Sequence, residues 1–186
     1  MNSHHVIHPL VHHNTSDFSQ QRYSSVFTGR EPFFSDHLVN GRKTMPAAAY
    51  IEMVYTSISN ALNSEETHVI QFKDIVWIQP VIIDHRPVQI HIELDLEENG
   101  EIAFRVYSLS EGNDPDQILY CKGYASLNQN NEIPKVEIDE IRSQCCQERI
   151  ESEKVYEHFK SIGIDYGLRQ RGIEFLELGR AKFLLI

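Results

Sequence analysis

One long helix signal, from Pro46 to Leu62, constrains the fold of this chain more than any other feature. Pro46 suits the first helical position, where its fixed φ fits and its missing N–H group is not needed. Thr44, two residues earlier, is of a type that caps helices, and three alanines after the proline let another backbone approach closely. The apolar residues that follow recur at helical spacing: Ile51, Val54, Tyr55, Ile58, Ala61 and Leu62.

Four strand-like runs follow this predicted helix. The run VQIHIELDL places its apolar residues on one face by strict alternation. The sequence EENGE after it is a tight-hairpin signal. One long apolar helix followed by several antiparallel strands predicts an α+β fold in which the sheet wraps around the helix, which is the hotdog architecture. The runs are Val69–Trp77, Val88–Leu96, Ile102–Ser108 and Ile118–Leu127.

The later residues predict a linker, a short helix and the start of further structure. Residues 128–150 are polar and acidic with one proline, which is typical of a linker. Residues 151–162 have the pattern of an amphipathic helix, and Gly163 follows where a helix C-terminal glycine would stand. The residues from 171 to 186 most simply form a strand pair with exposed charges.

We therefore expect three parts in the chain. Residues 1–130 form an N-terminal hotdog, and residues 131–162 form a linker with the short helix. Residues 163–186 form the truncated beginning of a second, C-terminal hotdog.

Composition excludes several classes of function. The formal net charge of -10 argues against nucleic acid or an anionic membrane as the main partner. The apolar runs, such as FLLI near the end, are too short to span a bilayer. The first residues lack an apolar core of signal-peptide length, so we expect a cytoplasmic protein.

Neither the cysteines nor the histidines form a recognisable framework. Cys121, Cys145 and Cys146 are an odd number with one adjacent pair, which is a poor disulfide pattern and predicts reduced thiols. The histidines crowded at the start lack the Cys or carboxylate partners of a closed zinc site, so no metal site is predicted there. These histidines are His4, His5, His8, His12 and His13.

His37 is the candidate for chemistry, in the segment FFSDHLVNGRKTMPAAAYIEM. Gly41 permits a turn with positive φ or the close approach of a substrate. Pro46 begins a helix whose free N–H groups would point to the same mouth. A general base and an oxyanion-stabilising dipole would then face one point. From the residues alone, a purely structural histidine before a helix stays open.

The spacing His-x-x-x-Gly-x-x-x-x-Pro, which here is His37, Gly41 and Pro46, resembles the signature of polyketide-synthase dehydratase domains. The stretch HPLVHHNTSDFSQQRYSSVFTG resembles their N-terminal part, especially in bacterial synthases served by separate acyltransferases. PAAAYIEM resembles the start of their central helix, and GIDYGLRQRGIEFLELG is similar to the opening of their second hotdog. The resemblance covers nearly the whole chain.

The resemblance implies a double hotdog that eliminates water from a 3-hydroxyacyl thioester and leaves a 2-enoyl thioester. The substrate rides on the phosphopantetheine arm of an acyl carrier protein, and no external cofactor is needed. His37 would remove the α-proton, and an aspartate of the second hotdog would protonate the leaving hydroxyl. Neighbouring polyketide synthase domains are expected partners, and a homodimer stays open. The residues expected to contact substrate are Gly41, Pro46, Ala47, Tyr166 and Gly167.

Three departures from the family pattern bear on this expectation. Ala47 stands where the family usually has glycine after the motif proline, which narrows the mouth. In the Tyr-Gly-Pro motif, Leu168 replaces the proline and Arg171 replaces a glutamine. The segment expected to carry the catalytic aspartate is not among these residues, and Asp165 does not match its position. No catalytic acid is therefore assigned.

Other activities stay open beside dehydration. Related domains keep the histidine, lack the aspartate and shift a double bond from α,β to β,γ, so an enoyl isomerase is the first alternative. A catalytically silent hotdog that only binds an acyl chain is the second. A hotdog thioesterase is weaker, because it would need a carboxylate to activate water, and only Glu52 on the predicted helix is near.

Three further residues carry expectations of their own. Asp36 is expected to be solvated, since neighbours on an extended segment point to opposite faces and it would not orient the imidazole of His37. Tyr166 is expected either to line the substrate tunnel or simply to pack. Trp77 is expected in the core or at an interface.

Overall fold

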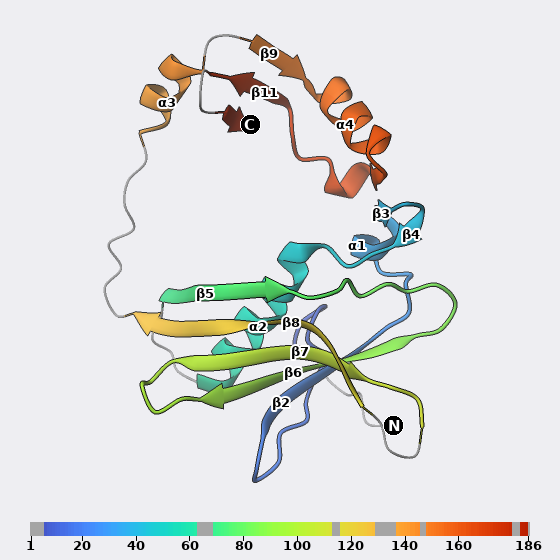
Figure 1. Ribbon diagram of the computed structural model, residues 1–186, viewed down its shortest axis with the longest axis vertical. Coiled ribbons are helices and arrows are strands. Elements are labelled where there is room, and N and C mark those ends of the chain that lie inside the picture. The colour runs from blue at the N-terminus through green and yellow to red at the C-terminus, as the bar shows by residue number, and fades with distance from the viewer. Residues whose placement is uncertain are drawn as a thin grey trace. The chain divides into compact units, whose positions relative to one another are not determined.

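The computed structural model describes residues 6–62, 69–112, 116–128, 137–145, 148–179 and 183–185. The chain divides into two compact units, residues 1–30 with 45–131 and residues 31–44 with 132–186 (Figure 1). This division differs from the three predicted parts, because residues 31–44 belong with the later residues. The assignment of those parts as hotdog, linker and second hotdog stays a prediction.

A six-stranded antiparallel sheet and one long helix make up the first unit (Figure 1). The strand order is β1-β2-β6-β7-β8-β5, and the helix α2 lies against one face of the sheet. This arrangement confirms the predicted hotdog fold, and each predicted strand matches its observed bounds within one residue. The elements are β1 (His13–Asn14), β2 (Gln21–Phe27), α2 (Ala47–Leu62), β5 (Val69–Trp77), β6 (Val88–Leu96), β7 (Ile102–Leu109) and β8 (Gln117–Asn128).

Alternation along the strands and helical spacing along α2 produce the core. Ile90, Ile92 and Leu94 of β6 are buried on one face, as the pattern predicted. The buried residues of α2 recur every three or four positions. One of them, Tyr50, accepts a hydrogen bond from the backbone N–H of Val81 at 2.8 Å, and burial raises the pKa of its hydroxyl to about 12. The phenol therefore stays neutral and links the helix to the chain beside it.

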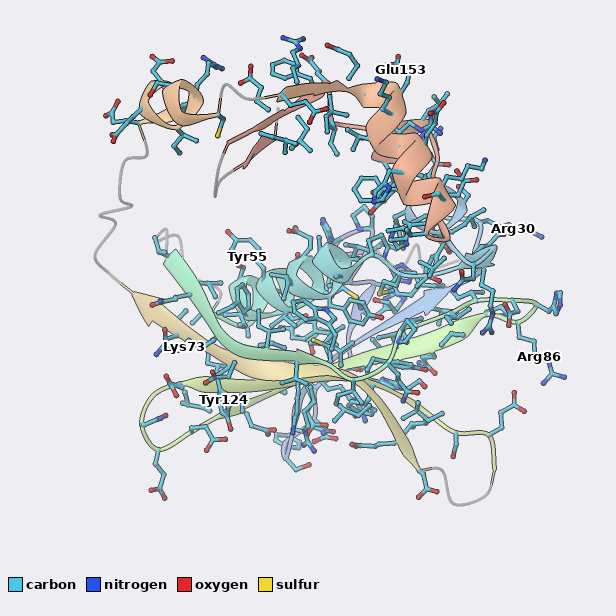
Figure 2. All side chains as sticks on the ribbon, turned by 45° about the horizontal axis from the view of Figure 1, so that its top comes forward. Arg30, Tyr55, Lys73, Arg86, Tyr124 and Glu153 are labelled. Carbon is cyan, nitrogen blue, oxygen red and sulfur yellow. The ribbon has the colours of Figure 1, made fainter. Side chains whose placement is uncertain are left out.

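The edge strand β5 is less covered than the central strands. The register between β5 and β8 shifts between Lys73 and Val76, and Asp74 in this bulge has φ +50. Trp77 is 48% exposed, so the prediction of a core tryptophan is wrong, and its place at an interface stays a prediction. Figure 2 labels Lys73 of β5 and Tyr124 of β8, which are register partners.

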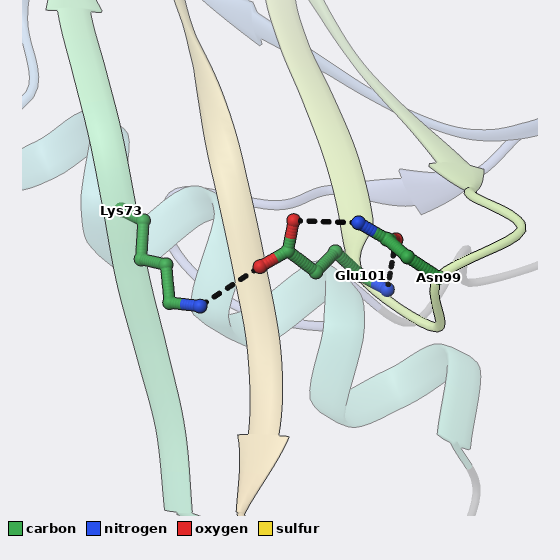
Figure 3. Close-up of polar contacts among 3 residues, drawn as sticks. All are labelled: Lys73, Asn99 and Glu101. Carbon is green, nitrogen blue, oxygen red and sulfur yellow. Dashed lines mark hydrogen bonds and ion pairs between the residues drawn. The ribbon is translucent and has the colours of Figure 1, made fainter.

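A polar network crosses the sheet surface from β5 to the β6–β7 hairpin (Figure 3). Lys73 Nζ donates to Glu101 Oε1 at 2.8 Å, and Asn99 Nδ2 donates to Glu101 Oε2 at 3.0 Å. The hydrogen bond and the charge of Lys73 lower the pKa of Glu101 below its ordinary value, and Glu101 in turn raises the pKa of Lys73. Both groups therefore stay charged through the neutral range.

We expect Lys73→Met to destabilise the fold slightly near neutral pH. The lowered pKa of Glu101 means that the pair stabilises the fold above the ordinary carboxyl value and loses this contribution as pH falls through the lowered one. The difference in free energy of unfolding between wild type and Lys73→Met should therefore shrink in acid, and also in about 1 M salt. Urea titrations at neutral pH, at low pH and in salt measure it, with Lys122→Met as a control. A difference that persists under all three conditions contradicts the ion-pair explanation.

The described residues of the second unit form two small sheets and several helices. The first sheet has the order β10-β3-β4, and the second has the order β12-β11-β9. The strands are β3 (His37–Val39), β4 (Arg42–Lys43), β9 (Glu148–Glu151), β10 (Ile164–Tyr166), β11 (Phe175–Leu178) and β12 (Phe183–Leu185). The helices are α1 (Pro32–Ser35), α3 (Ile138–Gln144), α4 (Ser152–Ser161) and the 3₁₀ turn η1 (Leu168–Gln170).

Several predictions for the second unit can be compared with these elements. The short helix is confirmed as α4, and Gly163 after it has φ +88, as a helix C-terminal glycine requires. The strand pair near the end is confirmed as β11 with β12. Residues 128–150, predicted as a linker, contain α3 and β9, because β9 takes its backbone partners from β11 rather than from a local pattern.

The remaining composition-based expectations concern helices, thiols and metals. Among the described helices, none is long and apolar enough to cross a bilayer. Cys121 and Cys145 are free and buried, burial raises the pKa of Cys121 to about 11, and Cys146 lies outside the described residues. Within the described part of the chain, no group of three or more His, Cys, Asp or Glu side chains could hold a metal ion. His4 and His5 lie outside that part.

Candidate active site

A tight hairpin presents His37. Strands β3 and β4 pair antiparallel, with Leu38 opposite Lys43, and Asn40 and Gly41 form the two-residue connection. Both connecting residues have positive φ, +50 and +75, which suits the Asn-Gly type of hairpin turn. Among the described residues other than Gly41 and its two chain neighbours, no heavy atom lies within 4 Å of where a Cβ of Gly41 would stand. Gly41 is therefore a turn residue, and its contact with substrate stays a prediction.

The hairpin also orients the imidazole of His37. Its Nδ1 lies 2.8 Å from the carbonyl oxygen of Thr44, and the Thr44 N–H donates to the His37 carbonyl at 3.1 Å. A carbonyl oxygen can only accept, so Nδ1 carries the hydrogen in this bond. In the neutral imidazole with this tautomer, Nε2 keeps its lone pair, which is the form a general base needs. The hydroxyl of Thr44 donates to the Arg42 carbonyl at 3.0 Å, and the role of Thr44 as a cap of α2 stays a prediction.

Tyr166 packs against His37 although the two are far apart in sequence. Strand β10 pairs with β3 so that Tyr166 stands opposite His37. The two rings lie 5.4 Å apart between centroids, at an interplanar angle of 59°. The Tyr166 ring also meets the rings of Tyr156 and Phe159 of α4 edge-on, with 6.0 and 5.4 Å between centroids. Tyr166 therefore links the candidate base to α4, and a role in a substrate tunnel stays a prediction.

Asp36 contacts the segment that follows Tyr166, which sequence reasoning missed. Its carbonyl accepts the Gly167 N–H at 2.8 Å, and its Oδ2 accepts the Arg169 N–H at 3.1 Å. A Cβ at position 167 would lie 2.5 Å from Asp36 Cγ, so only glycine fits there. The carboxylate of Asp36 is half-buried and caps the turn η1, a contact that the prediction of a solvated Asp36 did not include. The carboxylate accepts from the Ser35 hydroxyl at 3.3 Å and from the Arg169 N–H at 3.1 Å.

Leu168 and Arg171, the two departures from the family's Tyr-Gly-Pro motif, differ in their contacts. Arg171 Nε donates to the Tyr166 carbonyl at 2.9 Å, and its guanidinium lies 5.2 Å from the centroid of the Tyr156 ring. The Tyr156 hydroxyl accepts the Ile173 N–H at 2.9 Å. Leu168 is 85% exposed, so the change from proline puts an apolar side chain on the surface rather than against Tyr166. Arg171 therefore contacts both the Tyr166 backbone and the Tyr156 ring, whereas Leu168 faces solvent.

Pro46 and Ala47 belong to the first compact unit. The helix α2 begins at Ala47, one residue later than predicted, and the Pro46 carbonyl accepts the Ala49 N–H at 3.0 Å. Ala47 is exposed and Pro46 half-buried. The other candidate residues, His37, Gly41, Tyr166 and Gly167, belong to the second unit. The convergence of the α2 amides with the imidazole therefore stays a prediction.

Glu52 offers little to the thioesterase alternative. Its side chain is 51% exposed, and its Oε1 lies 3.8 Å from Nε2 of His8. A carboxylate that activates water for hydrolysis works best in a shielded site, where its interactions are strong. Glu52 is a surface residue of α2 with a histidine beside it.

Comparison with known proteins identifies the family. A model of the polyketide synthase dehydratase domain matches residues 8–109. Polyketide synthase PksN of Bacillus subtilis (strain 168) is 44% identical over 181 residues, which are 96% of this chain and 3% of PksN. The chain thus spans a small part of this relative.

Solved structures agree with the sequence relatives. A trans-AT polyketide synthase dehydratase domain from Brevibacillus brevis is 41% identical with a TM-score of 0.90, over 96% of this chain and 63% of that one. The CurK dehydratase of the curacin synthase, solved as an inactive Asp→Asn variant, is 25% identical with a TM-score of 0.81, over 96% of this chain and 62% of that one. This chain belongs to the polyketide synthase dehydratase domain family.

Proposed function

We propose that this chain works in the dehydratase of a modular polyketide synthase, with His37 as the base that removes the α-proton. The hydrogen bond from His37 Nδ1 to the Thr44 carbonyl carries the proposal. It selects the tautomer with a free lone pair on Nε2, and it holds the ring through the same hairpin that carries the residue. The ring of Tyr166 supports the imidazole from β10.

The chemistry needs one base, one acid and a place for negative charge. A thioester acidifies the α-proton, so an imidazole near neutral pH can remove it as the charge moves toward the thioester oxygen. The backbone amides that begin α2, after Pro46 and Ala47, are our candidates to hold that oxygen. No external cofactor enters these steps, because the electrons of the broken C–H bond expel the β-hydroxyl.

The acid must come from elsewhere. Expelling hydroxide near neutral pH requires a proton donor to the oxygen. The CurK dehydratase is inactive as its Asp→Asn variant, which supports an aspartic acid in that role in a relative. Asp165 is half-buried and paired with Lys160 at 2.9 Å, so it is a poor candidate for a donor. We assign the acid to the second hotdog of the domain.

The partner follows from the same proposal. The relatives are long synthases of which this chain matches a few per cent, so neighbouring synthase domains would surround it. We propose an acyl carrier protein as the donor of a 3-hydroxyacyl thioester on its phosphopantetheine arm. A homodimer and a cytoplasmic location stay predictions.

Two carrier-bound substrates in deuterated water test the proposal. The protein should convert a 3-hydroxyacyl thioester into a product lighter by one water, about 18 Da, because base and acid act together. Intact-protein mass spectrometry of the carrier reads this change directly. If the 3-hydroxyacyl substrate stays intact while a 2-enoyl substrate becomes a 3-enoyl thioester with deuterium at its α-carbon, the domain is an isomerase. If neither carrier changes, the domain is a silent acyl-binding hotdog.

A further inference from the structure

We propose that Asp36 is a positioning residue, which caps the turn η1 and so keeps the Tyr166 ring against the imidazole of His37. This inference rests on the proposed function, because it concerns the orientation of the proposed base. Its central observable, the packing of Tyr166 on His37, can however be measured without any turnover.

Asp36 holds the chain after Tyr166 at two points. Its carbonyl accepts the N–H of Gly167, and its carboxylate Oδ2 accepts the N–H of Arg169. The first N–H groups of a helical turn have no partner within the turn, and a carboxylate is a favourable acceptor for them. The bond to a charged oxygen is also stronger than a bond between neutral groups. One residue on the His37 side thus satisfies two donors of the Tyr166 segment.

Gly167 shows that this contact is built closely. Its φ of -73 and ψ of 170 are open to most residues, so the backbone conformation does not require glycine. The requirement comes from Asp36, whose Cγ, Oδ1 and Cβ would all lie within 2.7 Å of a Cβ at position 167. The two chain segments therefore touch at the one residue without a side chain.

The two contacts that Asp36 makes with Gly167 and Arg169, which we call the clamp, act on His37 through Tyr166. The Tyr166 backbone is bounded by β10 on one side and by the capped turn on the other, and Arg171 Nε holds its carbonyl. If the Arg169 N–H loses the carboxylate of Asp36, the turn η1 can open. The Tyr166 ring then no longer packs on the imidazole of His37. The His37 ring would then be freer to rotate away from the Thr44 carbonyl, and Nε2 would spend less time aimed at the substrate. A loss of orientation should appear in kcat more than in KM.

Asp36→Ala is expected to lower kcat for water loss by about 10–100-fold, the size seen when partners that orient a functional histidine are removed. KM for the carrier-bound substrate should change little. Asp36→Asn should recover most of the activity, because its amide oxygen can still accept the Arg169 N–H. Asp165→Ala is the matched control, since it removes a carboxylate from the neighbouring strand whose partner is Lys160. It should leave kcat unchanged.

Nuclear magnetic resonance separates this inference from the proposed function. In wild type and in Asp36→Asn, cross-peaks between the Tyr166 and His37 rings and a protonated Nδ1 are expected, and in Asp36→Ala the cross-peaks should weaken. If the wild type shows these signals but removes no water, the proposed function fails and the clamp stands. If Asp36→Ala keeps both full cross-peaks and full kcat, or if Asp36→Asn loses as much as Asp36→Ala, the clamp is wrong. Should Asp36→Ala not fold, Asp36→Glu, which displaces the carboxylate, is measured against the same outcomes.

Discussion

Replacing His37 with glutamine is expected to lower kcat for water loss by about 10²–10⁴-fold, the usual contribution of a general base. The amide side chain can keep a hydrogen bond to the Thr44 carbonyl, so the hairpin should stay intact. What is lost is the lone pair of Nε2, which the tautomer set by Thr44 makes available. Steady-state kinetics with a carrier-bound 3-hydroxyacyl thioester measure the effect, and far-UV circular dichroism checks the fold.

His85→Gln is the control for this variant. His85 is exposed between β5 and β6 and belongs to the first unit, so the same substitution there should leave kcat at the wild-type value. If the His37→Gln protein dehydrates at the wild-type rate, His37 is not the general base.

Replacing Phe104 with alanine is expected to cost about 3–5 kcal/mol in free energy of unfolding. Phe104 of β7 is 1% exposed and meets Phe72 of β5 edge-on, with 6.0 Å between ring centroids. Its ring also occupies the space over Gly123, where a Cβ would lie 2.8 Å from Phe104 Cζ. The truncation therefore opens a cavity at the centre of the sheet, bounded by three strands that cannot easily close it.

Leu96→Ala is the matched control for the core variant. Leu96 continues the apolar face of β6 but is 79% exposed, so its truncation should change stability by no more than about 0.5 kcal/mol. Urea denaturation followed by circular dichroism compares the two variants. Equal effects at the two positions would contradict the placement of the core around Phe104.

The elements that sequence predicted well are those with strong local patterns. The helix α2 carries buried residues every three or four positions, and the sequence of β6 alternates apolar and polar residues, so each predicts its element type locally. The burial of His91 and Glu93 on the other face of β6 was not part of that pattern. The hairpin that presents His37 had an equally local signal in Asn40-Gly41, which was overlooked. The resemblance found His37 itself, but the orientation of its ring depends on that hairpin.

The features that sequence did not predict depend on distant partners. The residues of β9 are polar and look like a linker, and they form a strand because β11 pairs with them. Asp36 looks like a surface carboxylate until Gly167 and Arg169 are brought beside it. The change to Arg171 looked like decay of a motif, whereas its guanidinium holds the Tyr166 carbonyl. In each case the deciding contact joins residues that no local pattern relates.

Hydration of a 2-enoyl thioester in deuterated water tests the central claim, that the His37 imidazole moves the α-proton, most directly. Dehydration run in reverse returns a proton to the α-carbon from the same group that removes it. The account predicts a 3-hydroxyacyl product with one deuterium at the α-carbon when the wild-type protein is used. With His37→Gln it predicts almost no labelled product. Labelled 3-hydroxyacyl thioester formed equally fast by both proteins would contradict the account.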